Sequence, residues 1–329
     1  MGGRGAMRIE VVEVQNAVGK LLCTPVFQPS GKKLLAKGRL ISSQDIQLLE
    51  SEGHSEVSIA VLEDNEIPEE EAAGRVATQG SGGSLEIRLG AGGRANIMAT
   101  HNGVVLVQEE TLRRLNSTGF LSMATLPNFS YAVAGQRIGT VKTSPFAVPR
   151  DPFAQALRLL SETGPVVQLT PIEEPTVAVL YSDPLSGDRA RTLFEGIMRT
   201  RLDRFGTSSA FVLSSVEEEE PLARNLEHLM RANPTLLLIA STTAPAGPGD
   251  VVGRAMCRAG CRVESFLAPV EPGNLLLLSY SSDVPVIAAP GCFRSPRPNA
   301  VDLVLPPLLA RYPMTASEIS AFGHGGLLV

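Results

Sequence analysis

The sequence lacks the features that would assign it to a membrane or an export pathway. No apolar run approaches the roughly 18 residues of a membrane-spanning helix, and the longest are short, such as Leu236–Ala240 and Leu275–Leu278. The N-terminus has no charged-then-apolar signal pattern, and its Gly-rich residues Met1–Ala6 are expected to be disordered. These absences favour a cytoplasmic protein without a membrane partner.

Neither sign of charge dominates the chain. The sequence has 29 Lys and Arg against 34 Asp and Glu, a net charge of −5, and the two signs are mixed along its length. This balance argues against a broad nucleic-acid or membrane surface. It leaves room for a local basic pocket that holds one phosphate.

Cysteine and histidine are scarce, with four of each. Cys257 and Cys261 lie close together, but no other Cys or His pair completes a zinc set, so no metal site is predicted. The cysteines are expected to be reduced and structural. No histidine has a nucleophile or metal partner nearby in sequence, and both the Walker A and GxGxxG patterns are missing.

What is present predicts several structural regions. The length of 329 residues and a hydrophobic content of 43% suit two or three domains with real cores. We expect a small α+β region over 7–94 that opens with a βαβ-like unit, a β-rich region over 95–150, a linker helix and strand over 151–174, and a final domain over 175–329. The Gly-rich stretch Gly80–Gly93 is interpreted as a flexible or turn-rich connection.

The final region alternates strands with helices. Apolar, β-branched runs predict strands at Thr176–Tyr181, Ala210–Leu213, Leu236–Ala240 and Cys261–Phe266, with helices at Asp188–Phe205, Glu219–Arg231 and Asp250–Ala259. Such alternation predicts an α/β fold, a parallel sheet with helices on both faces. Leu275–Tyr280 and Val284–Ala288 then resemble an antiparallel pair or adjacent strands, before a helix near Asn299–Ala310.

Three loops of this region fall where open α/β sheets bind ligands, outside the carboxyl ends of strands. The first runs from Ser241 and Thr242 through Gly247 and Gly249 to Asp250. Hydroxyls, glycines and a helix start can together hold an anion. Asp250 equally suits a plain helix N-cap, which needs no ligand.

The second loop contains Pro272, Gly273 and Asn274 directly before a strand. A Pro-Gly pair favours a tight turn. Taken alone, this turn is explained without a ligand, so only its position beside the other two loops makes it a candidate.

The third loop begins at Pro290 and Gly291, between a strand and a helix. A glycine there lets a ligand approach the backbone closely. The polar residues that follow suit a phosphate or a polar ring; they are Arg294, Ser295, Arg297 and Asn299. Arginines on a surface loop are more often simply solvated, and it is the strand–turn–helix context that favours a site.

These three loops, in this order, resemble the molybdopterin-binding domain of molybdenum insertases and of the adenylylating enzymes of molybdenum cofactor synthesis. The resemblance implies a Rossmann-like three-layer domain that binds molybdopterin or molybdenum cofactor through the loop residues named above. Further likeness is to bacterial molybdopterin-binding proteins that often precede a molybdenum cofactor cytidylyltransferase domain. It covers Pro269–Leu278, Gly325–Leu328 and, in the N-terminal half, Leu35–Asp45, Ala124–Pro127 and Thr140–Arg150.

The chain also departs from the family pattern. Ser241-Thr242-Thr243 stands where the family has Thr-Gly-Gly, and Glu271 stands where it has a Lys before Pro-Gly. Losing two glycines and a phosphate partner puts catalysis in doubt more than binding. No nucleotidyltransferase signature is present, so a cytidylyltransferase would be a separate partner.

Three hypotheses follow from the resemblance. The first is a cofactor-binding protein that acts during molybdenum cofactor biosynthesis or delivers the cofactor to a molybdoenzyme. The second is a transferase that inserts molybdate into molybdopterin or adenylylates it, with Asp250 as the catalytic metal or nucleotide ligand and Mg²⁺ as an accompanying ion. The third is a non-catalytic regulatory or scaffold protein whose acidic stretch Glu66–Glu71 contacts a partner, although such a stretch is usually a solvated helix face. Domains of this kind often self-associate, which implies a homodimer.

Overall fold

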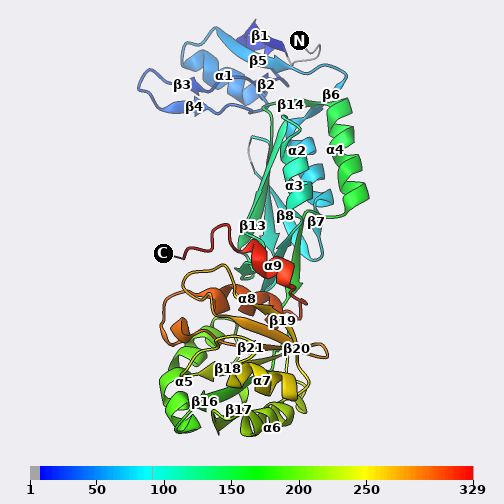
Figure 1. Cartoon of the computed structure of the whole chain (residues 1–329). Helices are drawn as coiled ribbons and strands as arrows, with labels where there is room; N and C mark the ends of the chain where they lie inside the picture. The colour runs from blue at the N-terminus through cyan, green and yellow to red at the C-terminus, as the bar shows by residue number, and fades with distance from the viewer. Residues whose placement is uncertain (1–7, 91, 329) are drawn as a thin grey trace. The chain divides into compact units, whose positions relative to one another are not determined.

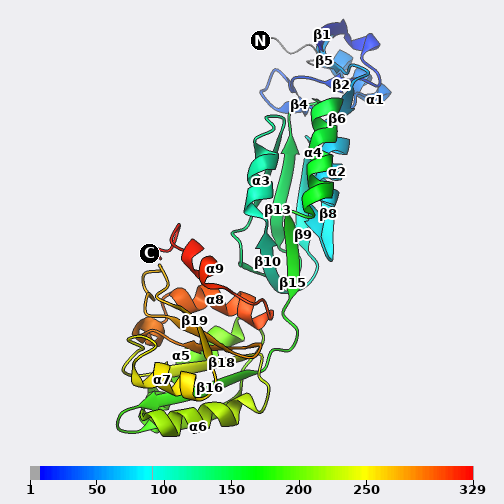
Figure 2. The same ribbon diagram turned by 45° about the vertical axis from the view of Figure 1, so that its right-hand side comes forward.

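The fold is described from a computed structural model that covers residues 8–90 and 92–328. The Gly-rich start that was expected to be disordered lies outside the described residues. Contacts divide the chain into two compact units, one of residues 1–128 with 132–169 and one of residues 129–131 with 170–329. Figures 1 and 2 show the elements of each unit, and each unit is described by itself.

The N-terminal unit opens with a three-stranded sheet and one helix. Its elements are β1 (Arg8–Glu13), β2 (Leu21–Leu22), β3 (Val26–Phe27), β4 (Lys33–Leu35), α1 (Ser43–Ser51) and β5 (Glu56–Val61). The order β1-β5-β2 places β5 antiparallel to both neighbours, so the expected βαβ-like unit is wrong. The Ser42 side chain and Asp45 form a capping box at the start of α1.

The rest of this unit is one core. Its elements are β6 (Glu66–Pro68), α2 (Glu69–Gln79), β7 (Ser81–Gly82), β8 (Leu85–Gly90), β9 (Arg94–Ala99), β10 (Gly103–Val107), α3 (Glu109–Asn116), β11 (Leu121–Thr125), β12 (Tyr131–Ala132), β13 (Arg137–Thr143), β14 (Ala147–Pro149), α4 (Arg150–Thr163) and β15 (Val167–Pro171). Two four-stranded sheets, β11-β13-β9-β8 and β12-β10-β15-β7, carry it.

This core differs from the expected boundaries. The pairing of β8 with β9 joins the two sides of the expected division at residue 94. The stretch Gly80–Gly93 forms strands β7 and β8 instead of a flexible connection. The expected linker 151–174 is structural, because Phe153, Ala156 and Leu160 of α4 are buried in the core. The acidic stretch Glu66–Glu71 is also partly internal, since Glu66 and Glu69 are buried.

The C-terminal unit is built on a six-stranded sheet. Its elements are β16 (Val177–Asp183), α5 (Gly187–Asp203), β17 (Ser209–Val216), α6 (Glu219–Met230), β18 (Leu236–Ser241), α7 (Val251–Arg258), β19 (Arg262–Phe266), β20 (Leu277–Ser281), β21 (Val284–Ala288), α8 (Ala300–Leu309) and α9 (Ala316–Ala321). These bounds lie within a few residues of the strands and helices predicted for this region.

The sheet order is β17-β16-β18-β21-β20-β19. Strands β17, β16, β18 and β21 run parallel, whereas β20 is antiparallel to both β21 and β19. Side chains of α6 and α7 pack with alternate residues of β16 and β18, including Leu180 and Ile239. Helices α5 and α8 cover the opposite face (Figures 1 and 2). The unit is therefore a mainly parallel α/β sheet with helices on both faces.

Candidate functional site

All three predicted loops lie at one edge of the six-stranded sheet. The first and third loops follow the parallel neighbours β18 and β21, and the second precedes the antiparallel strand β20. A Cβ added to Gly291 would lie 3.3 Å from Cβ of Ala244, so the first and third loops touch. The backbone N–H of Ala300 donates to the Pro272 carbonyl at 3.1 Å. This bond joins the second loop to the end of the third.

The first loop is organised by Asp250, the N-cap of α7. Its carboxylate accepts hydrogen bonds from the backbone N–H of Gly253, at 2.7 Å, and of Ala246. The plain N-cap interpretation of Asp250 is therefore realised, and a catalytic role for it stays a prediction. Gly247 has a φ of 140° and is buried, whereas Gly249 is exposed with open space around it. Of the two glycines, only Gly249 leaves room for a ligand.

Ser241 and Thr242, the other predicted residues of this loop, are bound to carboxylates that the sequence analysis missed. The Ser241 hydroxyl donates to Glu217, which also accepts from Ser182 at 3.1 Å and from Thr243. Glu217 follows β17, so it reaches this edge from the next strand but one. Glu217 lies four residues beyond the predicted strand Ala210–Leu213 and directly follows β17 only because the observed strand continues to Val216.

Thr242 donates to a second missed carboxylate, Asp183, at 2.6 Å. Asp183 ends β16, is fully buried, and also accepts from the backbone N–H groups of Leu185 and Ser186 and from Arg189. These hydrogen bonds, that of Thr242 first, lower the pKa of the Asp183 carboxyl to about 2. The carboxylate thus remains ionised at any physiological pH.

Because the pKa of Asp183 is lowered, the free energy of unfolding depends on pH in the acidic range. An unfolded Asp titrates near 3.9, so its contribution is complete above that pH and is lost as pH falls toward 2. We expect the free energy of unfolding to fall more steeply between pH 4 and pH 2 in the unaltered protein than in Asp183→Asn. Urea unfolding across this range measures both slopes, and equal slopes would contradict the prediction.

The second loop is held by the C-terminal tail. Glu271 donates its backbone N–H to the Gly326 carbonyl at 2.8 Å, and its own carbonyl accepts from Leu328 at 2.8 Å. Gly326 is required at this contact, since an added Cβ would lie 2.3 Å from the Pro269 carbonyl oxygen. A cavity of about 360 Å³ opens between loop and tail, and Asn274 is one of its lining residues. The tail motif is thus part of the second loop's support.

The third loop presents its two predicted arginines to solvent. Arg294 and Arg297 are exposed, and neither forms an ion pair within residues 8–90 and 92–328. The Ser295 hydroxyl accepts from the backbone N–H of Arg297 at 3.2 Å. Two guanidinium groups without carboxylates are free to meet an anion.

Asn299, the last predicted residue of the third loop, does not lie at the surface. It is fully buried and caps α8, where its side-chain oxygen accepts from Val301 at 3.0 Å. Its amide nitrogen has no hydrogen-bond partner among the described residues. Its observed role is to begin the helix that follows the loop, and its contact with a cofactor stays a prediction.

Arg201 of α5, another residue that the sequence analysis missed, fixes the backbone of the third loop. It is 4% exposed, and its guanidinium donates to three loop carbonyls, those of Phe293 at 3.1 Å, Ser295 at 2.9 Å and Arg297 at 3.1 Å. The same group pairs with Asp302 of α8 at 3.1 Å. A buried charge with this many partners is well compensated. It holds Arg294 and Arg297 on a rigid segment.

Other chemistry is sparse in the part of the chain that the structure describes. Its four cysteines are free, and no group of three His, Cys, Asp or Glu side chains there could hold a metal ion. No helix among the described residues is long and apolar enough to cross a membrane. The three loops at the carboxyl ends of the parallel strands are therefore the candidate functional site.

Comparisons with known proteins give partial likenesses. A family model described as a domain of unknown function (DUF8806) matches residues 11–61, and no curated protein matches the chain. Among solved structures, the chain is similar to a molybdopterin biosynthesis moeA protein from Pyrococcus horikosii, with 12% identity and a TM-score of 0.32 over 94% of this chain and 76% of that one. It is also similar to a molybdenum cofactor biosynthesis protein from Pyrococcus furiosus, with 12% identity and a TM-score of 0.27 over 93% of this chain and 65% of that one.

Proposed function

We propose that the C-terminal unit binds molybdopterin or a molybdenum cofactor form of it, during cofactor biosynthesis or its delivery to a molybdoenzyme. One observation carries the proposal. Two arginines that form no ion pair with the described residues, Arg294 and Arg297, stand on a loop that Arg201 fixes and that touches both other loops of the motif. A phosphate is the ligand that such a pair of guanidinium groups recognises best.

The neighbouring strands supply the second half of the ligand's chemistry. Glu217 is partly exposed and, with the hydroxyls of Ser241 and Thr243, lies at the ends of β17 and β18 on either side of β16, where the fully buried Asp183 holds Thr242 in place. Strand β21, which leads into the arginines, lies two strands from β16, about 10 Å at usual sheet spacing. One end of the site is therefore cationic and the other is rich in acceptors. A pterin suits this arrangement, because its phosphate accepts hydrogen bonds while its ring amine and amide N–H groups donate them.

The transferase alternative has less support from the geometry. Both oxygens of Asp250 are used in capping α7 and closing its own loop, so a metal or nucleotide would have to compete with backbone N–H groups. Incubating the protein with molybdopterin, ATP, Mg²⁺ and molybdate separates the two activities. Turnover that is lost in Asp250→Asn would favour the transferase.

Replacing an arginine of the third loop should weaken binding. We expect Arg297→Ala to lower the affinity for molybdopterin by about 1–3 kcal/mol, roughly 5- to 150-fold, the range for losing a charged hydrogen bond. Arg224→Ala is the matched control, because Arg224 is an exposed residue of α6. Isothermal titration calorimetry on the full chain measures both. Unchanged affinity in both Arg297→Ala and Arg294→Ala would remove the phosphate assignment.

Assembly and partners belong to the same proposal. We infer a cytoplasmic homodimer that receives the cofactor and passes it to a molybdoenzyme, or to a cytidylyltransferase that modifies it. Light scattering after size exclusion tests the dimer, and mass spectrometry of small molecules that co-purify after mild extraction identifies the cofactor form. A monomer would remove the dimer without touching the cofactor site.

A further inference from the structure

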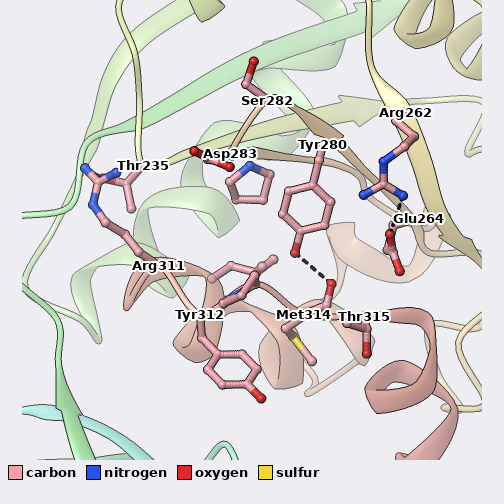
Figure 3. Close-up of a pocket in the computed structure, with 13 residues that line it drawn as sticks. Thr235, Arg262, Glu264, Tyr280, Ser282, Asp283, Arg311, Tyr312, Met314 and Thr315 are labelled. Atoms are coloured by element: carbon pink, nitrogen blue, oxygen red, sulfur yellow. Dashed lines mark hydrogen bonds and ion pairs between the residues drawn. The ribbon is translucent and has the colours of Figure 1, made fainter.

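A cavity of about 520 Å³ opens at the other edge of the six-stranded sheet, away from the three loops. Its walls come from the start of β18, the turn between β20 and β21, and the segment from α8 to α9 (Figure 3). That volume is in the range of small-molecule sites. Its floor is apolar, because Tyr280, Leu308 and Met314 are buried beneath it.

The charges around this cavity are unevenly matched. Arg262 and Glu264 pair with each other at 2.7 Å, and Glu264 also accepts from the Ala316 N–H. Arg311 and Asp283 have no such partner: within residues 8–90 and 92–328 neither forms an ion pair, and both are exposed. The cavity thus presents one cation and one carboxylate that are not neutralised by the protein.

The two unmatched groups lie on the same side of the cavity. Figure 3 shows Arg311, Thr235 and Asp283 on one side, Tyr280 in the middle and the Arg262–Glu264 pair on the other side. Arg311 donates to the Thr235 hydroxyl at 3.2 Å, and that hydroxyl also accepts from the Thr176 N–H at 3.1 Å. Thr235 is only 2% exposed, so its hydroxyl holds the Arg311 guanidinium at the wall of the cavity.

Arg311 occupies a backbone position that disfavours it. It follows the C-cap of α8 with a φ of 58°, in the left-handed region where helices usually place glycine. A residue with a Cβ is strained there. The one side-chain hydrogen bond that Arg311 forms with the described residues is to the Thr235 hydroxyl, which already accepts from Thr176. Neither the backbone conformation nor this hydrogen bond explains why an arginine stands at this position.

We propose that this cavity binds a small zwitterion, an α-amino acid with an apolar side chain. Its carboxylate would meet Arg311, its ammonium group would meet Asp283, and its side chain would lie on Tyr280 and the apolar floor. A simple anion would leave Asp283 facing it with like charge, and a simple cation would leave Arg311 unmatched. The site is separate from the pterin edge and does not depend on the proposed function.

Calorimetry and saturation-transfer NMR on the full chain test the proposal, with L-phenylalanine, L-leucine and L-methionine as probes. We expect at least one to bind, and Arg311→Gln and Asp283→Asn each to weaken it about tenfold or more, as expected for losing one charge-assisted hydrogen bond. The deaminated probe phenylpropionate and the decarboxylated probe phenethylamine should each bind more weakly than L-phenylalanine. Arg224→Gln on α6 is the control and should bind like the unaltered chain.

Arg311→Gly separates a ligand role from a structural one. Glycine relieves the left-handed backbone, so the midpoint of thermal unfolding should not fall, while amino-acid binding is lost. A lowered midpoint would show that Arg311 mainly supports the fold and would count against the site. No binding of any of the three amino acids at millimolar concentration would overturn the proposal, and so would phenylpropionate that binds as tightly as L-phenylalanine.

Discussion

Replacing Arg201 with methionine should destabilise the C-terminal unit by about 3–5 kcal/mol, the loss expected when one partner is removed from a buried ion pair. Methionine keeps an apolar stem under Phe293, which the guanidinium now faces at 4.7 Å. It leaves three loop carbonyls without their donor and removes the buried partner of Asp302. Urea denaturation followed by circular dichroism measures the loss.

Arg204→Met is the matched control for this change. Arg204 is the C-cap of the same helix and approaches the same carboxylate oxygen of Asp302 at 3.6 Å, but its side chain is 63% exposed. An exposed pair of this kind contributes about 0–1 kcal/mol. Two variants of equal stability would show that burial of Arg201 has no special role. At urea concentrations below its unfolding transition, Arg201→Met should also bind molybdopterin more weakly, because the backbone of the third loop is no longer fixed.

Local patterns were enough to find the loops, because each is marked by chemistry within a few residues. The Pro-Gly pairs at Pro272 and Pro290, and an acid before a helix at Asp250, fall between apolar runs that alternate with helical ones. Such alternation implies a mainly parallel sheet. Parallel neighbours place their carboxyl ends together, so the meeting of the loops could be inferred.

The supporting residues could not be found in the same way. Arg201 reaches its partners across 92 to 101 residues, and nothing near it in the sequence differs from an ordinary helix surface. Glu217 opens an acidic run that is typical of a solvated helix start. Which of several charged residues becomes buried is decided by packing of distant elements, and a single sequence does not contain that information.

The N-terminal boundaries were misplaced for a related reason. Leu85 and Ile87 alternate with Glu86 and Arg88, which is a strand pattern, but the surrounding glycines suggested a loop. Helix α4 was predicted as a helix, yet its amphipathic face does not identify the core that it covers. Periodicity assigns an element and its buried face, and leaves its neighbour undetermined.

Two glycines of α5 should respond oppositely to alanine. Gly187 begins the helix, and a Cβ there would lie 2.2 Å from the Ser215 nitrogen on β17. Relieving that overlap requires movement of backbone, so Gly187→Ala should cost about 2–3 kcal/mol. Gly196 lies in mid-helix, exposed, with nothing within 4 Å of an added Cβ. Gly196→Ala should instead stabilise by about 0.5–1 kcal/mol.

The two glycine variants should also differ in pterin binding. The turn before Gly187 supplies the N–H groups of Leu185 and Ser186 to Asp183, so moving it away from β17 would loosen that carboxylate and its Thr242 partner. We expect Gly187→Ala to lower the midpoint of thermal unfolding and weaken pterin binding together, and Gly196→Ala to change binding not at all. Thermal denaturation and calorimetry on the two variants decide this. Equal midpoints for the two variants would contradict the prediction, because they would show that the turn between β16 and α5 accommodates a Cβ at Gly187.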